Sequence, residues 1–325
     1  ITLPTGIDRD GKERTAVCCL SSLNIEKYDE WKDDKNFIKD VMRFLDNVLE
    51  DFIEKAPDEF ADAKYSALRE RSVGLGVMGL HSFFQQKMIP LESVMSKVWN
   101  KKIFEHIQKE VDQASKDLAE ERGACPDAAE YGFNERFSNK TAIAPTASIS
   151  IICGGTSPGV EPIAANSYTH KTLSGSFNVR NKYLKKLLQK HDKDDDETWS
   201  SITTNQGSVS HLNFLTQAEK DVFKTAFELD QKWIVELGAD RTPNISQAQS
   251  INIFLPADVH KKELHQIHFQ AWKKGLKSLY YCRSKSIQRA ENVNDAKSTD
   301  VTANVYKSKK QQGDQPEYEE CLSCQ

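Results

Sequence analysis

The spacing of apolar residues predicts several helices joined by short extended runs. Apolar residues recur every three or four positions over residues 36–55, so we expect an amphipathic helix with one side against the core. We expect burial of the stripe Phe37, Val41, Phe44, Leu45, Val48 and Phe52. A second helical stretch runs from about residue 91 to about residue 121.

Two further helices are predicted from the residues at their starts. Thr216 and Glu219 have the capping-box spacing, and we expect that helix to end near Gly238. Pro256 suits the first turn of a helix that reaches about Lys274. Short β-like runs lie between the helices at residues 143–145, 250–254 and 276–282. This alternation predicts an α/β fold.

The composition changes near the end of the chain. Residues 288–320 are rich in Lys, Asp, Asn, Gln and Ser and contain almost no large apolar residues, so this segment cannot offset the entropy lost on ordering. We therefore divide the chain into a folded part, residues 1–286, and a disordered tail, residues 287–325.

Charge and hydropathy argue against two classes of partner. The 325 residues carry a formal net charge of −4, which offers no basic field for nucleic acid. The longest apolar runs are too short to span a membrane, and the sequence begins without a signal-peptide pattern. We expect a cytoplasmic protein.

Seven cysteines are too few for a disulfide scaffold in a chain of this length. We expect Cys125, Cys153 and Cys282 to be small buried thiols. Cys321 and Cys324 stand three apart at the end of the tail, where a mobile dithiol could carry reducing equivalents between a buried site and an external reductant. The alternative is a pair of incidental cysteines.

Three other patterns have ordinary explanations. The acidic run at residues 191–197 suits a solvated loop, and His265 and His268 lack the further ligands that a metal site needs. Gly74, Gly76 and Gly79 match the dinucleotide pattern Gly-x-Gly-x-x-Gly, but a polar, helix-prone segment precedes them instead of a buried strand. Close packing of the backbone explains these glycines better than an NAD site. We predict no metal site in this chain.

Three motifs carry candidate chemistry. The residues Pro145, Thr146, Ala147, Ser148 and Ile149 follow a short strand and could hold a phosphate through hydroxyl and backbone N–H groups, especially if a helix begins there. A plain Ser/Thr turn explains them about as well.

The other two motifs suggest redox chemistry. Tyr280 and Tyr281 end a strand-like run, where adjacent side chains normally point to opposite faces of a sheet. Two structural tyrosines are the default, and a one-electron relay through the phenols is the functional alternative. Cys18 and Cys19 lie in a second strand-like run, where a thiol could be structural or one half of a substrate-reducing pair.

Taken together, these motifs resemble the large, catalytic subunit of class I ribonucleotide reductase. The matching segments occur in the order of that family and cover essentially the whole chain. They are residues 1–5 (ITLPT), 16–18 (AVC), 71–80 (RSVGLGVMGL), 145–148 (PTAS), 161–162 (EP), 279–281 (LYY) and the tail dithiol.

The resemblance implies a fold and roles for particular residues. The fold would be the second half of a ten-stranded α/β barrel with surrounding helices. Cys18 would be one member of the cysteine pair that reduces the ribonucleotide, and Tyr280 and Tyr281 would relay a radical. Cys321 and Cys324 would reduce the disulfide that forms. We prefer Cys18 to Cys19 because strand alternation points Cys19 away from the site.

In this reading, residues 145–149 would hold the phosphates of a ribonucleoside diphosphate. A separate small subunit would supply the metal-radical cofactor, thioredoxin or glutaredoxin would reduce the tail dithiol, and ATP or deoxynucleotide effectors would bind the N-terminal part of the large subunit. This chain itself would bind no cofactor.

One departure from the family pattern limits the prediction. The family's thiyl cysteine lies in an Asn-x-Cys-x-Glu loop, and the 325 residues contain no such loop. We therefore expect a split large subunit, or a fragment of one, that needs an N-terminal partner chain. Two alternatives stay open, an adenosylcobalamin-dependent reductase of the same superfamily and a non-catalytic fragment that keeps the fold.

Overall fold

The computed structural model of the chain describes residues 2–172 and 175–284, of which residues 170–172 and 175–177 are described by backbone alone. The predicted tail, residues 287–325, lies outside the described residues, and so do Cys321 and Cys324. The division of the chain at residue 286 therefore stays a prediction.

Five parallel segments lie side by side in chain order. β3 (Leu20–Asn24) pairs in parallel with β4 (Gly74–Met78), and a parallel bridge joins β4 to residue 141. A second bridge joins residues 143 and 249, and β7 (Ile253–Leu255) pairs in parallel with β8 (Cys282–Ser284). Neighbouring backbone bonds extend the row to residues 19–24, 73–78, 139–143, 247–255 and 280–284. Such a row of parallel segments is the expected α/β architecture.

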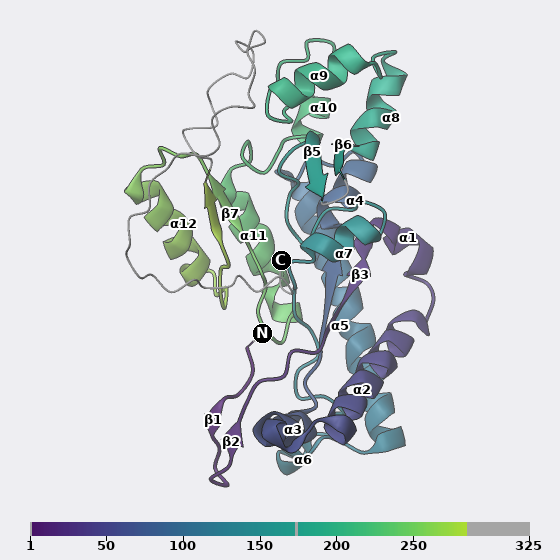
Figure 1. Ribbon diagram of the computed structural model, residues 1–325, viewed down its shortest axis with the longest axis vertical. Coiled ribbons are helices and arrows are strands. Elements are labelled where there is room, and N and C mark those ends of the chain that lie inside the picture. The colour runs from purple at the N-terminus through teal and green to yellow at the C-terminus, as the bar shows by residue number, and fades with distance from the viewer. Residues whose placement is uncertain (1, 173–174, 285–325) are drawn as a thin grey trace, which may run out of the picture.

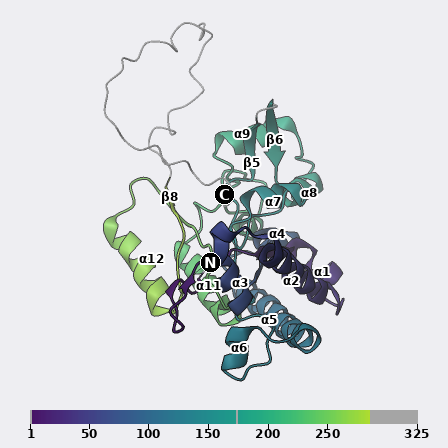
Figure 2. The same ribbon diagram turned by 60° about the horizontal axis from the view of Figure 1, so that its bottom comes forward.

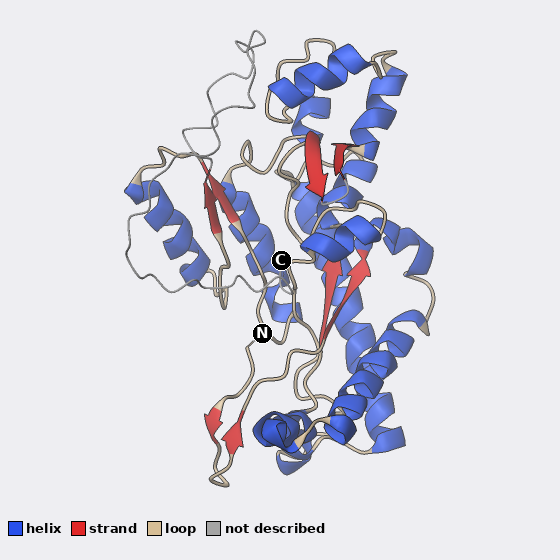
Figure 3. Ribbon diagram, in the orientation of Figure 1, coloured by secondary structure: helices blue, strands red, loops and turns tan. Residues whose placement is uncertain are grey.

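Helices connect consecutive segments, as parallel strands require (Figure 3). The first connection contains η1 (Ile25–Lys27), α1 (Tyr28–Trp31), α2 (Phe37–Lys55), η2 (Asp58–Phe60) and α3 (Ala61–Glu70). The second contains α4 (Leu80–Gln86), α5 (Val94–Arg122) and α6 (Pro126–Glu130). α12 (Lys261–Lys273) forms the last connection, between β7 and β8.

The third connection is the longest, and its middle part forms a separate lobe at the top of Figure 1. It contains α7 (Ala147–Ile152), β5 (Ser167–Thr172), β6 (Gly175–Arg180), α8 (Lys182–Lys190), α9 (Asp196–Thr204), α10 (Gln217–Val222), α11 (Gln231–Arg241) and η3 (Thr242–Asn244). The helices α8 to α10 enclose their own apolar cluster around Trp199 and Phe223. The hairpin of β1 (Gly6–Ile7) and β2 (Glu13–Arg14) lies close to α3 in Figures 1 and 2.

The glycine-rich motif is part of a buried strand, not a nucleotide loop. Gly74 and Gly76 lie within β4, where all five residues are buried. A Cβ atom on Gly76 would come within 2.2 Å of the carbonyl oxygen of Ala142 on the next segment. Gly79 follows β4 with φ of +81°, a backbone conformation that favours glycine. Close packing therefore explains these glycines, as predicted.

The amphipathic helix is confirmed as α2, and its buried side was predicted correctly in part. Leu45 is buried, and Phe37, Val41 and Phe52 are partly buried against the core, whereas Phe44 and Val48 were predicted wrongly. Phe44 is 61% exposed and Val48 is 43% exposed. α2 has two apolar stripes side by side, and the neighbouring stripe faces the sheet and α5. The buried apolar residues of α2 are Ile38, Met42, Leu45, Leu49 and Ile53. Apolar spacing alone could not tell which stripe the partner elements cover.

Other boundaries were predicted with mixed success. The helix expected from residue 91 is confirmed as α5. The capping box of Thr216 and Glu219 is present, but its helix ends at Val222, and Asp230 caps a separate helix, α11. Pro256 follows β7 and does not open the next helix, which begins after the cap His260. The strand expected over residues 276–282 is shorter and lies at β8.

Candidate redox and phosphate site

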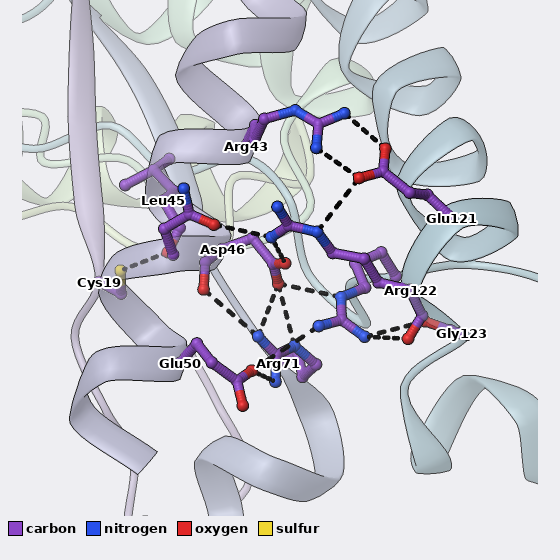
Figure 4. Close-up of polar contacts among 11 residues, drawn as sticks. Cys19, Arg43, Leu45, Asp46, Glu50, Arg71, Glu121, Arg122 and Gly123 are labelled. Atoms are coloured by element: carbon purple, nitrogen blue, oxygen red, sulfur yellow. Dashed lines mark hydrogen bonds and ion pairs between the residues drawn. The ribbon is translucent and has the colours of Figure 1, made fainter. Parts of the chain in front are cut away.

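The two adjacent cysteines before β3 have opposite environments. Cys19 is buried, and its Sγ donates to the carbonyl oxygen of Leu45 on α2 at 3.7 Å (Figure 4). Burial raises the pKa of the Cys19 thiol to about 11, so this thiol is a poor source of thiolate. Cys18 is exposed. Cys18 thus has the accessible position that a redox cysteine needs.

The helix beside Cys19 is held by a buried ion cluster (Figure 4). Asp46 on α2 is fully buried, and its carboxylate accepts from Arg71 at 2.7 Å, from Arg122 at 2.9 Å and from Arg136 at 3.0 Å. Although burial opposes the charge, these guanidinium groups keep the pKa of Asp46 below its ordinary value. The cluster joins α2 to the ends of α3 and α5 and so supports the packing beneath the two cysteines.

The predicted phosphate segment turns directly into a helix. Thr146 is buried with φ of 53°, its Oγ1 accepts from the backbone N–H of Gly159 at 2.7 Å, and α7 begins at Ala147. Ala147, Ser148 and Ile149 are exposed in the first turn. The N-terminus of a helix after a short strand favours binding of an anion. The phosphate interpretation of the sequence depended on a helix beginning here, and α7 does begin here.

A lysine ties the end of this segment to the neighbouring lobe. Lys182, at the start of α8, donates to the carbonyl oxygen of Gly154 at 3.1 Å and pairs with the carboxylate of Glu26 at 2.5 Å. Glu26 is buried in η1, directly after β3. The loop after α7 is therefore fixed to both the first parallel segment and α8.

The paired tyrosines lie together just before β8. Their ring centroids are 4.0 Å apart, and the hydroxyl of Tyr280 donates to the hydroxyl of Tyr281 at 3.3 Å. The two side chains are 40% and 49% exposed. The expectation of opposite faces was wrong, since the two rings are in contact. Two phenols in hydrogen-bond contact are suited to passing a proton and an electron between them.

The sequence did not single out Asn252, which fixes the second tyrosine. Asn252 is 1% exposed, and its Oδ1 accepts from the backbone N–H of Tyr281 at 3.0 Å. The buried carboxyl group of Glu161 faces the same side chain. A polar residue inside the apolar run of residues 250–254 was the available signal for Asn252.

The structure thus distributes the predicted residues along the row of parallel segments. Cys18 lies at the start of the first segment, residues 145–149 follow the third, and Tyr280 and Tyr281 lie in the fifth. Of the other cysteines, Cys125 is buried as expected, whereas Cys153 and Cys282 are exposed, contrary to expectation. His265 and His268 lie on the exposed side of α12.

The described residues contain neither a metal-binding cluster nor a membrane-spanning helix. In residues 2–172 and 175–284, no group of three or more His, Cys, Asp or Glu side chains is placed to hold a metal ion. No helix in the same part of the chain is both long and apolar enough to cross a membrane.

Comparison with known proteins points to a single family. The family model described as "Ribonucleotide reductase, barrel domain" matches residues 7–135 and 127–282. The chain is 51% identical over 297 residues to the ribonucleoside-diphosphate reductase large subunit of Invertebrate iridescent virus 6, covering 90% of this chain and 30% of that protein. It is 45% identical over 302 residues to the large subunit of Invertebrate iridescent virus 3, covering 92% of this chain and 47% of that protein.

A solved structure agrees with these matches. The chain superposes on the alpha subunit of the Actinobacillus ureae class Id ribonucleotide reductase with a TM-score of 0.78 and 39% identity, covering 84% of this chain and 50% of that one. The chain spans about a third to a half of the length of these relatives. With the family model matching most of the described fold, the chain belongs to the ribonucleotide reductase family, in which it matches the barrel domain over part of the large subunit.

Proposed function

We propose that this chain forms part of a class I ribonucleoside-diphosphate reductase large subunit and takes part in reducing ribonucleotides to deoxyribonucleotides. The observation that carries the proposal is the contact between the hydroxyl groups of Tyr280 and Tyr281 at 3.3 Å. A purely structural role for the two tyrosines would not require their half-exposed hydroxyl groups to touch. A one-electron relay does need them, because each phenol must release a proton together with its electron.

The thiols would supply the reducing equivalents. Cys18 and a second cysteine would be oxidised from two thiols to one disulfide, giving up two electrons and two protons while the 2′-hydroxyl of the ribonucleotide leaves as water. Cys321 and Cys324 would then exchange with that disulfide and restore the thiols. The exposure of Cys18 supports this role, since its sulfur is accessible to both the substrate and the tail.

The substrate would be held through its phosphates at the start of α7. Pro145, Thr146, Ala147, Ser148 and Ile149 present a helix N-terminus, whose partial positive charge favours an anion. Ribonucleoside diphosphates are the substrate class in the names of the relatives. The tight turn at Thr146, held by Gly159, supports a fixed position for this first helical turn.

The proposed reaction needs polypeptide beyond these residues. No Asn-x-Cys-x-Glu loop occurs in the 325 residues, so the thiyl cysteine and the partner of Cys18 would come from the N-terminal half of the barrel. A separate small subunit would supply the metal-radical cofactor, and thioredoxin or glutaredoxin would reduce the tail. ATP and deoxynucleotide effectors would bind the N-terminal part, and the assembly would work in the cytoplasm.

The test is reconstitution of nucleotide reduction. The chain is combined with a polypeptide carrying the N-terminal half, with the small subunit and with thioredoxin, and deoxycytidine diphosphate formation from cytidine diphosphate is measured. We expect turnover only in the complete mixture, and we expect Tyr281→Phe to reduce it to background because phenylalanine cannot lose a phenolic proton. Tyr131→Phe, which alters an exposed tyrosine on the distant α6 turn, is the matched control and should keep full activity.

The other outcomes identify the alternatives. Turnover that depends on adenosylcobalamin and survives Tyr281→Phe would indicate the cofactor-dependent relative. Absence of turnover in every mixture, with an assembled complex present, would favour a non-catalytic fragment. Robust turnover by this chain with the small subunit alone would contradict the need for the N-terminal half.

A further inference from the structure

Glu161 is a buried acid that the proposed chemistry does not use. It lies in the loop that returns after α7, and only 8% of its surface is exposed. One carboxylate oxygen, Oε1, is buried without a hydrogen-bond partner among the described residues. An unpartnered buried carboxyl oxygen is costly, so this group needs an explanation.

The loop that carries Glu161 is built against the phosphate segment. The backbone N–H of Gly159 donates to Oγ1 of Thr146, and that of Glu161 donates to the carbonyl oxygen of Pro158 at 3.0 Å. A Cβ atom on Gly159 would come within 2.9 Å of the carbonyl oxygen of Ala144. This tight return places Glu161 at a fixed position beside the row of parallel segments.

On its other side, Glu161 faces the residue that holds the tyrosine pair. The side chain of Asn252 interacts with the carboxyl group of Glu161, while its Oδ1 accepts from the backbone N–H of Tyr281 at 3.0 Å. Tyr281 in turn touches Tyr280 through the hydroxyl groups. A polar chain therefore runs from Glu161 through Asn252 to Tyr281.

The charged surroundings of Glu161 come from two further elements. On β8, the guanidinium group of Arg283 favours the ionised carboxylate and also lies over the ring of Tyr281, 5.7 Å from its centroid. On α4, the buried imidazole of His81 accepts from the backbone N–H of Ile163, two residues beyond Glu161, and burial lowers the pKa of His81 to about 3. His81 is thus neutral. Burial outweighs Asn252 and Arg283 and raises the pKa of Glu161 to about 7.

We propose that Glu161 is a positioning residue for the tyrosine pair and acts through the side-chain amide of Asn252 on the backbone of Tyr281. This inference deepens the proposed function, because a catalytic use of the tyrosine pair depends on that function. The polar chain from Glu161 to Tyr281 does not depend on the proposed function and can be measured in this chain alone. Amide dipoles in such a chain polarise one another, so ionising Glu161 strengthens the bond that Asn252 accepts from Tyr281.

The experiment follows the Tyr281 amide by NMR in the complete chain labelled with ¹⁵N-tyrosine. The amide signal of residue 281 is assigned by its disappearance in Tyr281→Phe. We expect its proton shift to move downfield as pH rises from 5.5 to 8.5, in one step with a midpoint near 7, the pKa of Glu161. In Glu161→Gln, which has the shape of the neutral acid but cannot ionise, the step should be absent.

Glu70→Gln is the matched control. Glu70 is also buried, and its pKa is also raised to about 7, but it lies at the end of α3 beside Ser72. The Tyr281 step should persist in this variant. A wild-type Tyr281 signal that does not move between pH 5.5 and 8.5, or a step that persists in Glu161→Gln, would overturn the proposal. The first of these results needs no substitution at Glu161, so it holds even if Glu161→Gln folds poorly.

Activity in the reconstituted complex provides a separate measurement. Glu161→Gln should change the pH profile of kcat and leave KM unchanged, whereas a defect in the phosphate segment would raise KM. If the NMR step is present and the complex never turns over, the proposed function is wrong and the positioning contact stands. If the complex turns over and the step is absent, the positioning role is wrong.

Discussion

At the scale of single residues, two acids of this fold keep their protons near neutral pH. Glu70 and Glu161 are 2% and 8% exposed, and burial raises the pKa of each to about 7. Between the ordinary carboxyl pKa and 7, the folded state binds more protons than the unfolded state. Each group therefore lowers the free energy of unfolding as pH rises through this window, by up to about 1.4 kcal/mol per pH unit.

Replacing Glu70 with Gln should remove its part of this pH dependence. We expect the variant to gain stability relative to the wild type between pH 5.5 and pH 8, by roughly 2 kcal/mol, because glutamine needs no proton to stay neutral. Urea unfolding of both proteins at the two pH values measures the difference. An equal pH dependence in the two proteins would show that Glu70 ionises normally in the fold.

The accessible cysteine was predictable at this scale, and the residues around Tyr281 were not. Alternation along a strand places Cys18 and Cys19 on opposite sides, and a local pattern is enough to choose between them. Asn252 acts on Tyr281, 29 positions away, through the pairing of β7 with β8. Single-sequence reasoning has no access to that pairing, so the polar chain from Glu161 became visible only in the fold.

At the scale of elements, helix identity was predicted better than helix orientation. The apolar spacing of α2 is real, but two adjacent stripes satisfy it, and the choice between them depends on where β3 and α5 lie. The long helix expected after Thr216 failed for a related reason. Asp230 supplies a second N-cap, and its side chain accepts from the backbone N–H of Lys232, so a new helix begins there.

The ion cluster on α2 gives a prediction at the scale of elements. Asp46→Asn leaves the guanidinium groups of Arg71, Arg122 and Arg136 close together without their shared carboxylate, so we expect a loss of about 3 kcal/mol or more in the free energy of unfolding. The control is Asp51→Asn on the same helix, where the exposed pair with Lys55 is screened by solvent and should contribute far less. Urea titration of both variants compares them, and equal losses would mean that the buried cluster contributes no more than a surface pair.

At the scale of the whole molecule, the family resemblance predicted the architecture that local patterns could not. The β-like runs at residues 143–145, 250–254 and 276–282 are too short for their sequence to predict the strand order in a sheet. The structure joins them into one parallel row through single bridges and short ladders. All but the last residues of this row lie in the part of the chain that the barrel-domain family model matches. The tail dithiol, in contrast, was found from sequence alone and lies outside the described residues.

The strands at the two ends of this row each have one edge without a pairing partner among the described strands. Of the described strands, β3 pairs with β4 and β8 pairs with β7, which leaves one backbone edge of each end strand for further pairing. If the N-terminal half of the barrel completes the sheet, binding it should slow backbone amide exchange at residues 20–24 and 282–284. The α8–α10 lobe has its own apolar cluster and should exchange at the same rate in both states.

Hydrogen exchange followed by mass spectrometry, with and without the N-terminal polypeptide, measures both regions. Uniform protection of the lobe and the edges would indicate general stabilisation instead of edge pairing, and unchanged edges in a formed complex would rule out completion of the barrel at these strands.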